Sequence, residues 1–369
     1  MTPKYLFIDD ETGEPTQAML DGFNDTKLID VNQLTLSKGE SFEAVCNKIK
    51  DEYNNHQYDG VLIDLCLDGT GANSLAFKAQ PFAQQIRSWA FEGIISHFPV
   101  VLCSTLDNDK VYQKDSASHD LFDYYFYKTE VNFIKESMRL KSLADGYQIL
   151  NKQRSKVEEY LGRDDYDVLD SKIIDYLRGP STYDIARRIV KDLLPYSGIL
   201  IDQNVVAARM GVDIAASNEN WERLRDAIYR EASFTGVFSS GWQRCWSDKV
   251  NAFFINKSEG RPYQIMNAEE RVDILRKAGF DGLEAAKPVN LNNSSYFNTA
   301  CYYSGLPIDS MEGIPVEDRM SLKSWQENHY VSFFFVARGD FKEENLCQEG
   351  MNKMQEIKQR IQDEQAKSE

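Results

Sequence analysis

Five polar residues directly follow short apolar runs, and their types suit metal and phosphoryl chemistry. Asp9 and Asp10 follow YLFI, Asp64 follows GVLI, Ser104 follows VVLC, and Lys128 follows YYFY. Taken singly, each acid could merely end a strand or cap a turn. Held close together, however, three carboxylates repel one another unless a divalent cation lies among them, and oxygen ligands suit Mg²⁺. A lysine and a hydroxyl beside that metal could hold the oxygens of a phosphoryl group.

The elements expected over the first 130 residues would bring these side chains together. The four apolar runs are typical of buried strands. One helix is expected over 41–53, where apolar residues recur at intervals of 3, 4 and 4 after a possible N-cap at Ser41. Another is expected around 81–91. Strands that alternate with helices indicate a parallel sheet covered on both faces, with ligands at the carboxyl ends of its strands.

On these residues, the first 130 to 145 positions resemble the receiver domain of bacterial response regulators, the CheY-like fold. The resemblance implies an α/β, flavodoxin-like fold with a doubly wound, parallel, five-stranded sheet. It also implies that Asp64 is the phosphoacceptor, supplied by a histidine kinase or a phosphotransfer protein. Asp9, Asp10, Asp64 and the backbone carbonyl of Cys66 would then hold Mg²⁺.

The same resemblance assigns roles to three further residues. Ser104 in VLCST matches the serine or threonine that hydrogen-bonds the phosphoryl group, and Lys128 in YFYK matches the lysine that pairs with it. Tyr125 stands where the family has its switch aromatic, three residues before the lysine.

The sequence departs from the receiver pattern around these residues. Asp68-Gly69 replaces the usual Pro-Gly, Thr129 replaces the proline after the lysine, and the interval from Asp64 to Ser104 is longer than usual. Thr105 fills a position that is usually small, which would restrict water and slow phosphate loss. Related pseudo-receivers keep the fold without being phosphorylated, so a non-phosphorylated scaffold or interaction protein is the alternative.

Patterning divides the chain into four expected segments. Apolar residues recur at helical spacing from Val131 to Leu161. Up to Leu150 this pattern fits equally a signalling helix or the last receiver helix packing on its own sheet, and beyond Leu150 it favours a connector. The expected segments are a receiver-like domain at 1–140, a helical connector at 141–165, a mixed α+β output or interaction domain at 166–345 that is rich in helices and aromatic residues, and a charged helical tail at 346–369.

Nothing in residues 166–345 indicates a familiar enzyme. The segment contains no P-loop, nucleophile elbow or kinase signature, and the acids and arginine of 306–319 read as a solvated turn rather than a catalytic site. We therefore expect no enzymatic activity beyond the receiver's own phosphoryl chemistry, and an enzyme with an unrecognised site in the C-terminal segment is the weaker alternative. The run Tyr330 to Val336 predicts a buried strand.

Residues 202–230 also have the Ala207-x-x-x-Gly211 spacing of a helix-turn-helix. Residues 199–232 hold four basic and six acidic residues, however, so this segment lacks the basic surface of a DNA-binding element. A unit that packs or docks on a partner protein is the preferred interpretation.

Composition supports a signalling protein that acts through protein contacts. The 369 residues carry a net charge of −16, with 10 basic against 21 acidic residues over 1–130, which argues against nucleic acid as a partner. The six cysteines form no C-x-x-C and the four histidines are isolated, so zinc is not indicated. Without a signal sequence or a long apolar run, a cytoplasmic location is expected. The sequence thus predicts an atypical response regulator of a two-component phosphorelay, with a protein effector and possible self-association.

Overall fold

The computed structural model describes residues 2–69, 73–105, 120–165, 168–290 and 293–368. The chain forms two compact units. The N-terminal unit comprises 1–192 and 235–242, and the C-terminal unit comprises 193–234 and 243–369. No helix within the described ranges combines the length and the apolar character needed to cross a membrane. The predicted segment boundaries at 140, 165 and 345 remain predictions.

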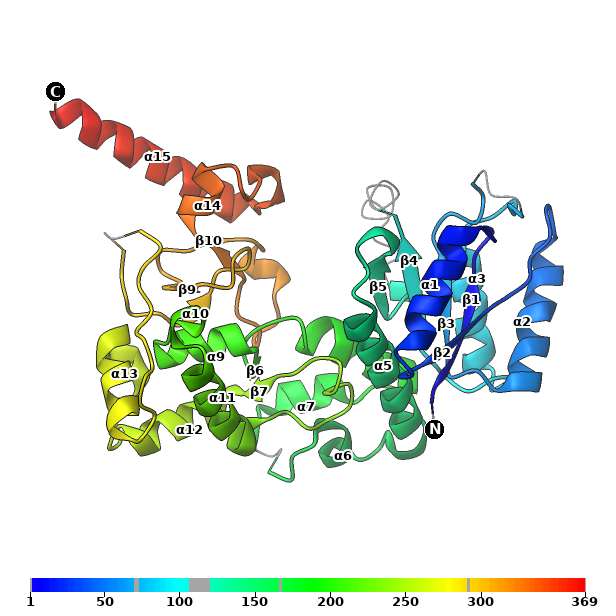
Figure 1. Cartoon of the computed structure of the whole chain (residues 1–369), viewed down its shortest axis with the longest axis horizontal. Coiled ribbons are helices and arrows are strands. Elements are labelled where there is room, and N and C mark those ends of the chain that lie inside the picture. The colour runs from blue at the N-terminus through cyan, green and yellow to red at the C-terminus, as the bar shows by residue number, and fades with distance from the viewer. Residues whose placement is uncertain (1, 70–72, 106–119, 166–167, 291–292, 369) are drawn as a thin grey trace. The chain divides into compact units, whose positions relative to one another are not determined.

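A five-stranded parallel sheet forms the centre of the N-terminal unit (Figure 1). Its order is β2-β1-β3-β4-β5, which is typical of flavodoxin-like folds and confirms the predicted parallel sheet. The strands are β1 (Lys4–Ile8), β2 (Asp30–Gln33), β3 (Gly60–Asp64), β4 (Val100–Ser104) and β5 (Tyr124–Tyr127).

Helices cover both faces of this sheet. On one face, α2 (Phe42–His56) and α3 (Ala79–Phe91) share an apolar core with alternate residues of β1, β3 and β4. On the other face lie α1 (Glu14–Asp25) and α5 (Phe133–Gln153), where Phe23 meets Phe133 edge-on at 5.2 Å. Both helices predicted between the strands are confirmed, and the Ser41 side chain caps α2 by accepting a hydrogen bond from the Ala44 amide.

The helix after β5, α5, packs on the sheet for most of its length. The Tyr5 hydroxyl donates to the Leu140 carbonyl at 2.6 Å, and Leu143 and Leu150 are buried. The helix ends at Gln153 instead of continuing to Leu161 as predicted, because the six residues 151–156 are all polar and supply no apolar side chain to bury. Further helices follow: α6 (Val157–Leu161), α7 (Ser171–Leu177), α8 (Thr182–Arg188) and a π-helical turn (Ile189–Leu193).

The C-terminal unit is mainly helical, and its described residues form three short antiparallel strand pairs: β6 with β7, β8 with β9 and β10 with β11. Its core gathers side chains of α9, α11, α12 and α13. The helices are α9 (Gln203–Met210), α10 (Ile214–Ser217), α11 (Glu219–Ala232), α12 (Ser247–Lys257), α13 (Ala268–Lys277), α14 (Phe333–Ala337) and α15 (Gln348–Ser368). The strands are β6 (Leu200–Ile201), β7 (Cys245–Trp246), β8 (Thr299–Ala300), β9 (Pro307–Ile308), β10 (Ile314–Pro315) and β11 (Tyr330–Val331).

One predicted strand is largely a helix. Only Tyr330 and Val331 pair as β11, and α14 begins two residues later. The Ser332 side chain caps α14 by accepting from the Phe334 amide at 3.3 Å, which turns the backbone out of the extended form. A short, continuously apolar run is compatible with a buried strand and with a helix. The spacing of apolar residues in this segment therefore could not distinguish the two.

Candidate functional site

The register of the sheet brings four of the predicted side chains to one edge. Ile8 pairs with Ile63, so Asp9 emerges beside Asp64 at the carboxyl ends of β1 and β3. Ser104, the last residue of β4, pairs with Tyr127, and Lys128 follows immediately. The alignment follows from parallel pairing, in which neighbouring strands end at the same side of the sheet.

Lys128 connects two of the acids. Its ammonium lies 2.7 Å from Asp9 Oδ2 and 2.6 Å from Asp64 Oδ1. The second oxygen of each acid accepts a backbone hydrogen bond: Asp9 Oδ1 from the Glu11 amide and Asp64 Oδ2 from the Cys66 amide, both at 2.9 Å. Each carboxylate is therefore held at both oxygens, which fixes its orientation at the sheet edge.

Asp10 is placed differently. Its carboxyl is buried, and Oδ2 has no hydrogen-bond partner within the described residues. Burial, followed by repulsion from Asp9 and Asp64, raises the pKa of Asp10 to about 6. A buried carboxylate oxygen that lacks a donor is costly, so this group needs either a proton or a cation.

The charges of Asp64 and Lys128 depend on each other. Burial raises the pKa of Asp64, although the Lys128 ammonium opposes this shift. Burial also disfavours the charge on Lys128, but the neighbouring Cys103, Asp64 and Asp9 side chains outweigh it, and the pKa of the ammonium is raised. Lys128 therefore stays protonated and offsets part of the negative charge of the cluster.

The three acids fit a divalent cation. One oxygen each from Asp9, Asp10 and Asp64 lies within 4.8 Å of the others. Carboxylate oxygens that converge in this way, one of them without a donor, suit a hard cation such as Mg²⁺. The carbonyl of Cys66 remains a predicted fourth ligand.

The remaining predicted residues have distinct surroundings. Ser104 is buried, and its hydroxyl donates to the carbonyl of the half-buried Thr105 at 3.1 Å. Tyr125 is 43% exposed, and its ring meets Tyr127 edge-on at 5.9 Å. Burial raises the pKa of the half-buried Cys66 thiol, which favours its protonated form. The structure thus brings Ser104 to the acidic edge and leaves Tyr125 accessible on β5.

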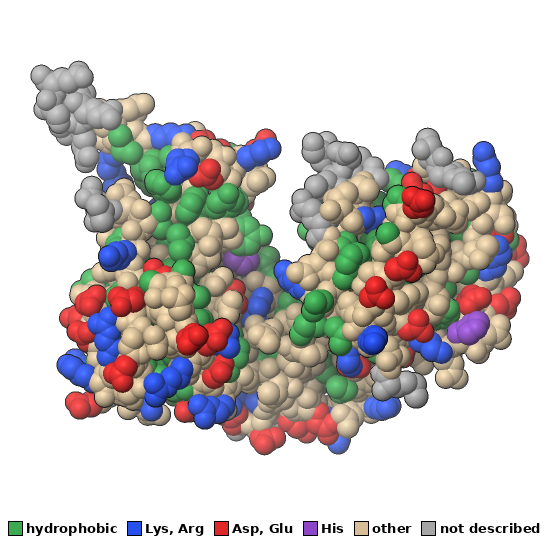
Figure 2. Space-filling model, in the orientation of Figure 1, with side chains coloured by type: hydrophobic (Ala, Val, Ile, Leu, Met, Phe, Trp, Pro, Cys, Tyr) green, Lys and Arg blue, Asp and Glu red, His purple; other side chains and the backbone are tan. Residues whose placement is uncertain are grey.

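The first arginine of the predicted helix-turn-helix region pairs with an acid inside the protein and is not available to contact DNA. Arg209 is buried and donates to both carboxylate oxygens of Glu327, at 2.8 and 3.0 Å. Figure 2 shows acidic and basic side chains interspersed over the face that carries α11, α12 and α13. Neither feature favours binding to a phosphate backbone.

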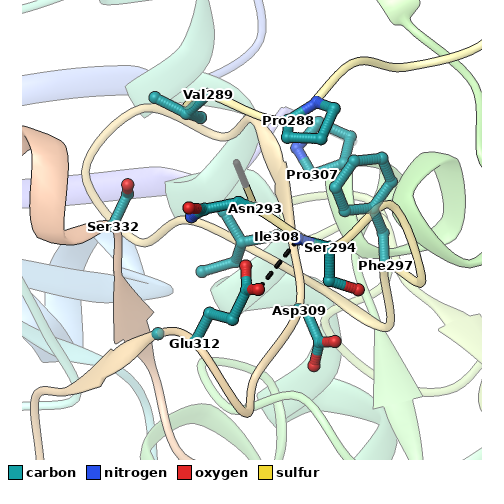
Figure 3. Close-up of a pocket in the computed structure, with 11 residues that line it drawn as sticks. Pro288, Val289, Asn293, Ser294, Phe297, Pro307, Ile308, Asp309, Glu312 and Ser332 are labelled. Carbon is teal, nitrogen blue, oxygen red and sulfur yellow. Dashed lines mark hydrogen bonds between the residues drawn. The ribbon is translucent and has the colours of Figure 1, made fainter. Parts of the chain in front are cut away.

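The acids of 306–319 serve local structure. Glu312 Oε1 accepts from the Ser294 amide at 2.8 Å (Figure 3). Asp309 Oδ1 accepts from the Met311 amide at 2.9 Å. The cavity beside them, lined also by Phe297, holds only about 10 Å³. That volume suits at most one water molecule, so the solvated-turn interpretation is preferred to a catalytic one.

Two long-range contacts of buried arginines could not be predicted from the sequence. Arg209 meets Glu327 across 118 positions, and the Arg87 guanidinium contacts Asp123 at 2.7 Å across 36 positions. The sequence around each arginine does not distinguish it from an exposed arginine. Only the packing of distant elements shows which residue it contacts.

No protein-family model matches this chain, and no curated protein is significantly similar to it. The five-stranded parallel sheet of order 2-1-3-4-5 and the cluster of Asp9, Asp10 and Asp64 are compatible with a receiver-like fold.

Proposed function

We propose that the protein is an atypical response regulator that is phosphorylated on Asp64 with Mg²⁺. The observation that carries this proposal is the Lys128 ammonium, which contacts both Asp9 and Asp64 at the carboxyl ends of adjacent parallel strands. An enzyme of phosphoryl transfer needs a nucleophile and fixed positive charge around the phosphoryl oxygens. Asp64 supplies the first and Lys128 part of the second.

The reaction at this site is a simple displacement. An Asp64 carboxylate oxygen attacks phosphorus, and the bond from phosphorus to the donor breaks, leaving an acyl phosphate on Asp64 and releasing the donor's nitrogen or oxygen with its electron pair. Lys128 and the Ser104 hydroxyl would then bind phosphoryl oxygens. When bound by Asp9, Asp10 and Asp64, Mg²⁺ would offset the charge that develops on the transferring group.

The donor would be a histidine kinase or a phosphotransfer protein, and the output a change in protein contacts. Exposed apolar side chains in the C-terminal unit support a protein effector: Met311 is 80% exposed and Met320 is 96% exposed. Apolar surface of this kind is common at protein interfaces.

A non-phosphorylated scaffold is the second candidate, and one contact favours it. Because Lys128 already pairs with Asp9 and Asp64, the cluster is partly neutralised without any metal. In that case the acids and the lysine would stabilise the fold, and partner binding would not depend on Asp64.

Intact-protein mass spectrometry separates the two. The full chain is incubated with acetyl phosphate and Mg²⁺, beside Asp64→Ala and the matched control Asp68→Ala, which removes an exposed acid four residues away. A phosphorylatable receiver gains one phosphoryl mass in the wild type and in Asp68→Ala, but not in Asp64→Ala or with EDTA. No added mass in any sample supports the scaffold, and added mass in Asp64→Ala would refute Asp64 as acceptor.

A further inference from the structure

The C-terminal unit contains a cavity that the proposed phosphoryl chemistry does not use. Its volume is roughly 660 Å³, within the range of sites for small molecules. Arg209 at the end of α9, Tyr263 and residues of the segment 319–330 line it. All of these belong to the C-terminal unit.

One wall of the cavity is held in a fixed geometry. Besides its two hydrogen bonds to Glu327, Arg209 donates to the Ser247 hydroxyl at 2.6 Å and to the Asn298 carbonyl at 3.3 Å. An arginine whose three nitrogens all donate, Nη2 to both Glu327 oxygens, Nη1 to Ser247 and Nε to Asn298, has little freedom to move. This wall therefore needs no rearrangement to receive a ligand.

A second arginine adds positive charge behind the same wall. Arg271 is fully buried and donates to the carbonyls of Met266, Ala208 and Phe297 at 2.6 to 3.1 Å. Within the described residues its hydrogen-bond partners are all carbonyls, and the carboxylates of Asp309 and Glu270 act on its charge without a hydrogen bond to it. Burial lowers the pKa of Arg271 to about 10, which leaves it charged at neutral pH.

Both guanidinium groups face the ring of Tyr263, which lines the cavity. The Arg271 guanidinium carbon lies 5.1 Å from the ring centroid, and that of Arg209 lies 6.0 Å from it. Charges this close in a partly buried site act over several ångströms because the surrounding dielectric is low. Since Glu327 offsets the charge of Arg209, the positive charge on this side of the cavity comes from Arg271.

Two further basic residues line the cavity. Arg319 is exposed and Lys323 is half-buried, and both line the cavity. The acids that line it are Glu327, which is already paired with Arg209, and Glu349. Three basic residues against two acids, with Arg271 behind them, favour an anion.

Neutral polar groups supply the rest of the lining. The side chains of Gln264, Thr299, Ser324 and Tyr330 offer amide and hydroxyl groups to the cavity. Groups of this kind bind hydroxyls and carbonyls of a polar ligand, and they contribute little to holding an apolar one.

We propose that this cavity binds a small, polar metabolite that carries an anionic group, either a carboxylate or a phosphate. Arg319 and Lys323 would contact the anionic group, and the amide and hydroxyl groups would contact the remainder. The site is independent of Asp64, so its failure and the failure of the phosphorylation proposal are distinguishable.

Isothermal titration calorimetry on the full chain tests this with three probes. Citrate carries carboxylates, glucose 6-phosphate carries a phosphate, and glucose is the neutral control. We expect saturable binding of citrate or glucose 6-phosphate, with no binding of glucose. Which anion binds identifies the class of ligand.

Variants locate the binding. The double variant Arg319→Ala/Lys323→Ala should bind the anion at least about tenfold more weakly than the wild type, because charge-assisted hydrogen bonds are lost. Arg338→Ala, which removes an exposed arginine elsewhere in the C-terminal unit, and Asp64→Ala should leave the affinity unchanged. Circular dichroism checks that the variants are folded.

Three results would overturn the proposal: no saturable binding of either anion, glucose binding as well as glucose 6-phosphate, or full affinity in the folded double variant.

Discussion

The Lys128 ammonium lies almost midway between two carboxylates, 2.7 Å from Asp9 Oδ2 and 2.6 Å from Asp64 Oδ1. Its side chain is 18% exposed, while those of Asp9 and Asp64 are 1% and 10% exposed. A lysine in this position stabilises the fold by pairing with both acids, and it also stands beside the oxygen that would receive a phosphoryl group. The contribution of Lys128 to stability can be tested separately from its contribution to phosphoryl transfer.

Removing the ammonium should destabilise the protein strongly in the absence of a metal. Lys128→Met leaves Asp9 and Asp64 buried beside Asp10 without their cation, and a broken buried pair costs about 3 kcal/mol or more. Urea denaturation in EDTA measures the loss. Adding Mg²⁺ should recover part of it, because a bound cation replaces the missing charge.

An exposed lysine provides the control for this substitution. Lys141 pairs with Asp145 on the surface of α5, where each side chain is about two-fifths exposed. Lys141→Met should cost less than about 1 kcal/mol with or without Mg²⁺, because solvent screens that pair. Equal losses in Lys128→Met and Lys141→Met would contradict the role assigned to Lys128.

Asp10 makes the N-terminal unit sensitive to pH. Its pKa rises from about 4 in the unfolded chain to about 6 in the folded one, so the folded state binds more protons between these values. The free energy of unfolding should therefore fall as the pH rises from about 4 to about 6 and level off above that. Denaturation in EDTA at several pH values measures this slope.

Asp10→Asn separates this contribution from those of other acids. The variant should be more stable than the wild type at pH 7 in EDTA, and the difference should shrink as the pH falls through 6. The same substitution removes a metal ligand, so Mg²⁺ should stabilise it less than the wild type. Asp68→Asn, an exposed acid, should show neither effect.

The acidic edge could be predicted because each of its residues stands at or directly after the end of a strand. Asp9, Asp64 and Lys128 each stand at the end of a clear apolar run, and parallel pairing places such ends side by side. The contact of Lys128 with both acids does not follow from this pattern. It depends on side-chain packing at the edge, which has no signature in sequence.

The C-terminal unit was predicted less completely because its strands are short. Its three strand pairs use two-residue strands such as Tyr330–Val331, too short for alternation to be visible. The cavity around Arg209 gathers residues from positions 209 to 349, so no local pattern marks it. The helix-turn-helix spacing at Gly211 could be recognised in the sequence, but in the structure this glycine allows α9 to pack closely against Ala268.

Arg271 should be necessary for the stability of the C-terminal unit. Its guanidinium donates to the carbonyls of Ala208, Met266 and Phe297, and Arg271→Met would remove all of these hydrogen bonds from a buried site. We expect a loss of about 3 kcal/mol or more in urea denaturation. Arg338→Met, at an exposed arginine, should be nearly neutral, and a similar value for Arg271→Met would refute its structural role.

Gly211 ends α9 in a left-handed conformation, and a matched glycine allows its packing to be measured. Its φ is +76°, and an added Cβ would lie 2.8 Å from Ala268 Cα and 2.9 Å from the Ala268 carbonyl oxygen. Gly279, with a φ of +96°, has no atom within 4 Å of the same position.

Gly279→Ala should therefore cost only backbone strain, about 1 kcal/mol. Gly211→Ala should cost clearly more, because α13 would have to move away from α9. Urea denaturation of the two variants tests this, and equal losses would show that close packing does not explain the glycine of the A-x-x-x-G spacing.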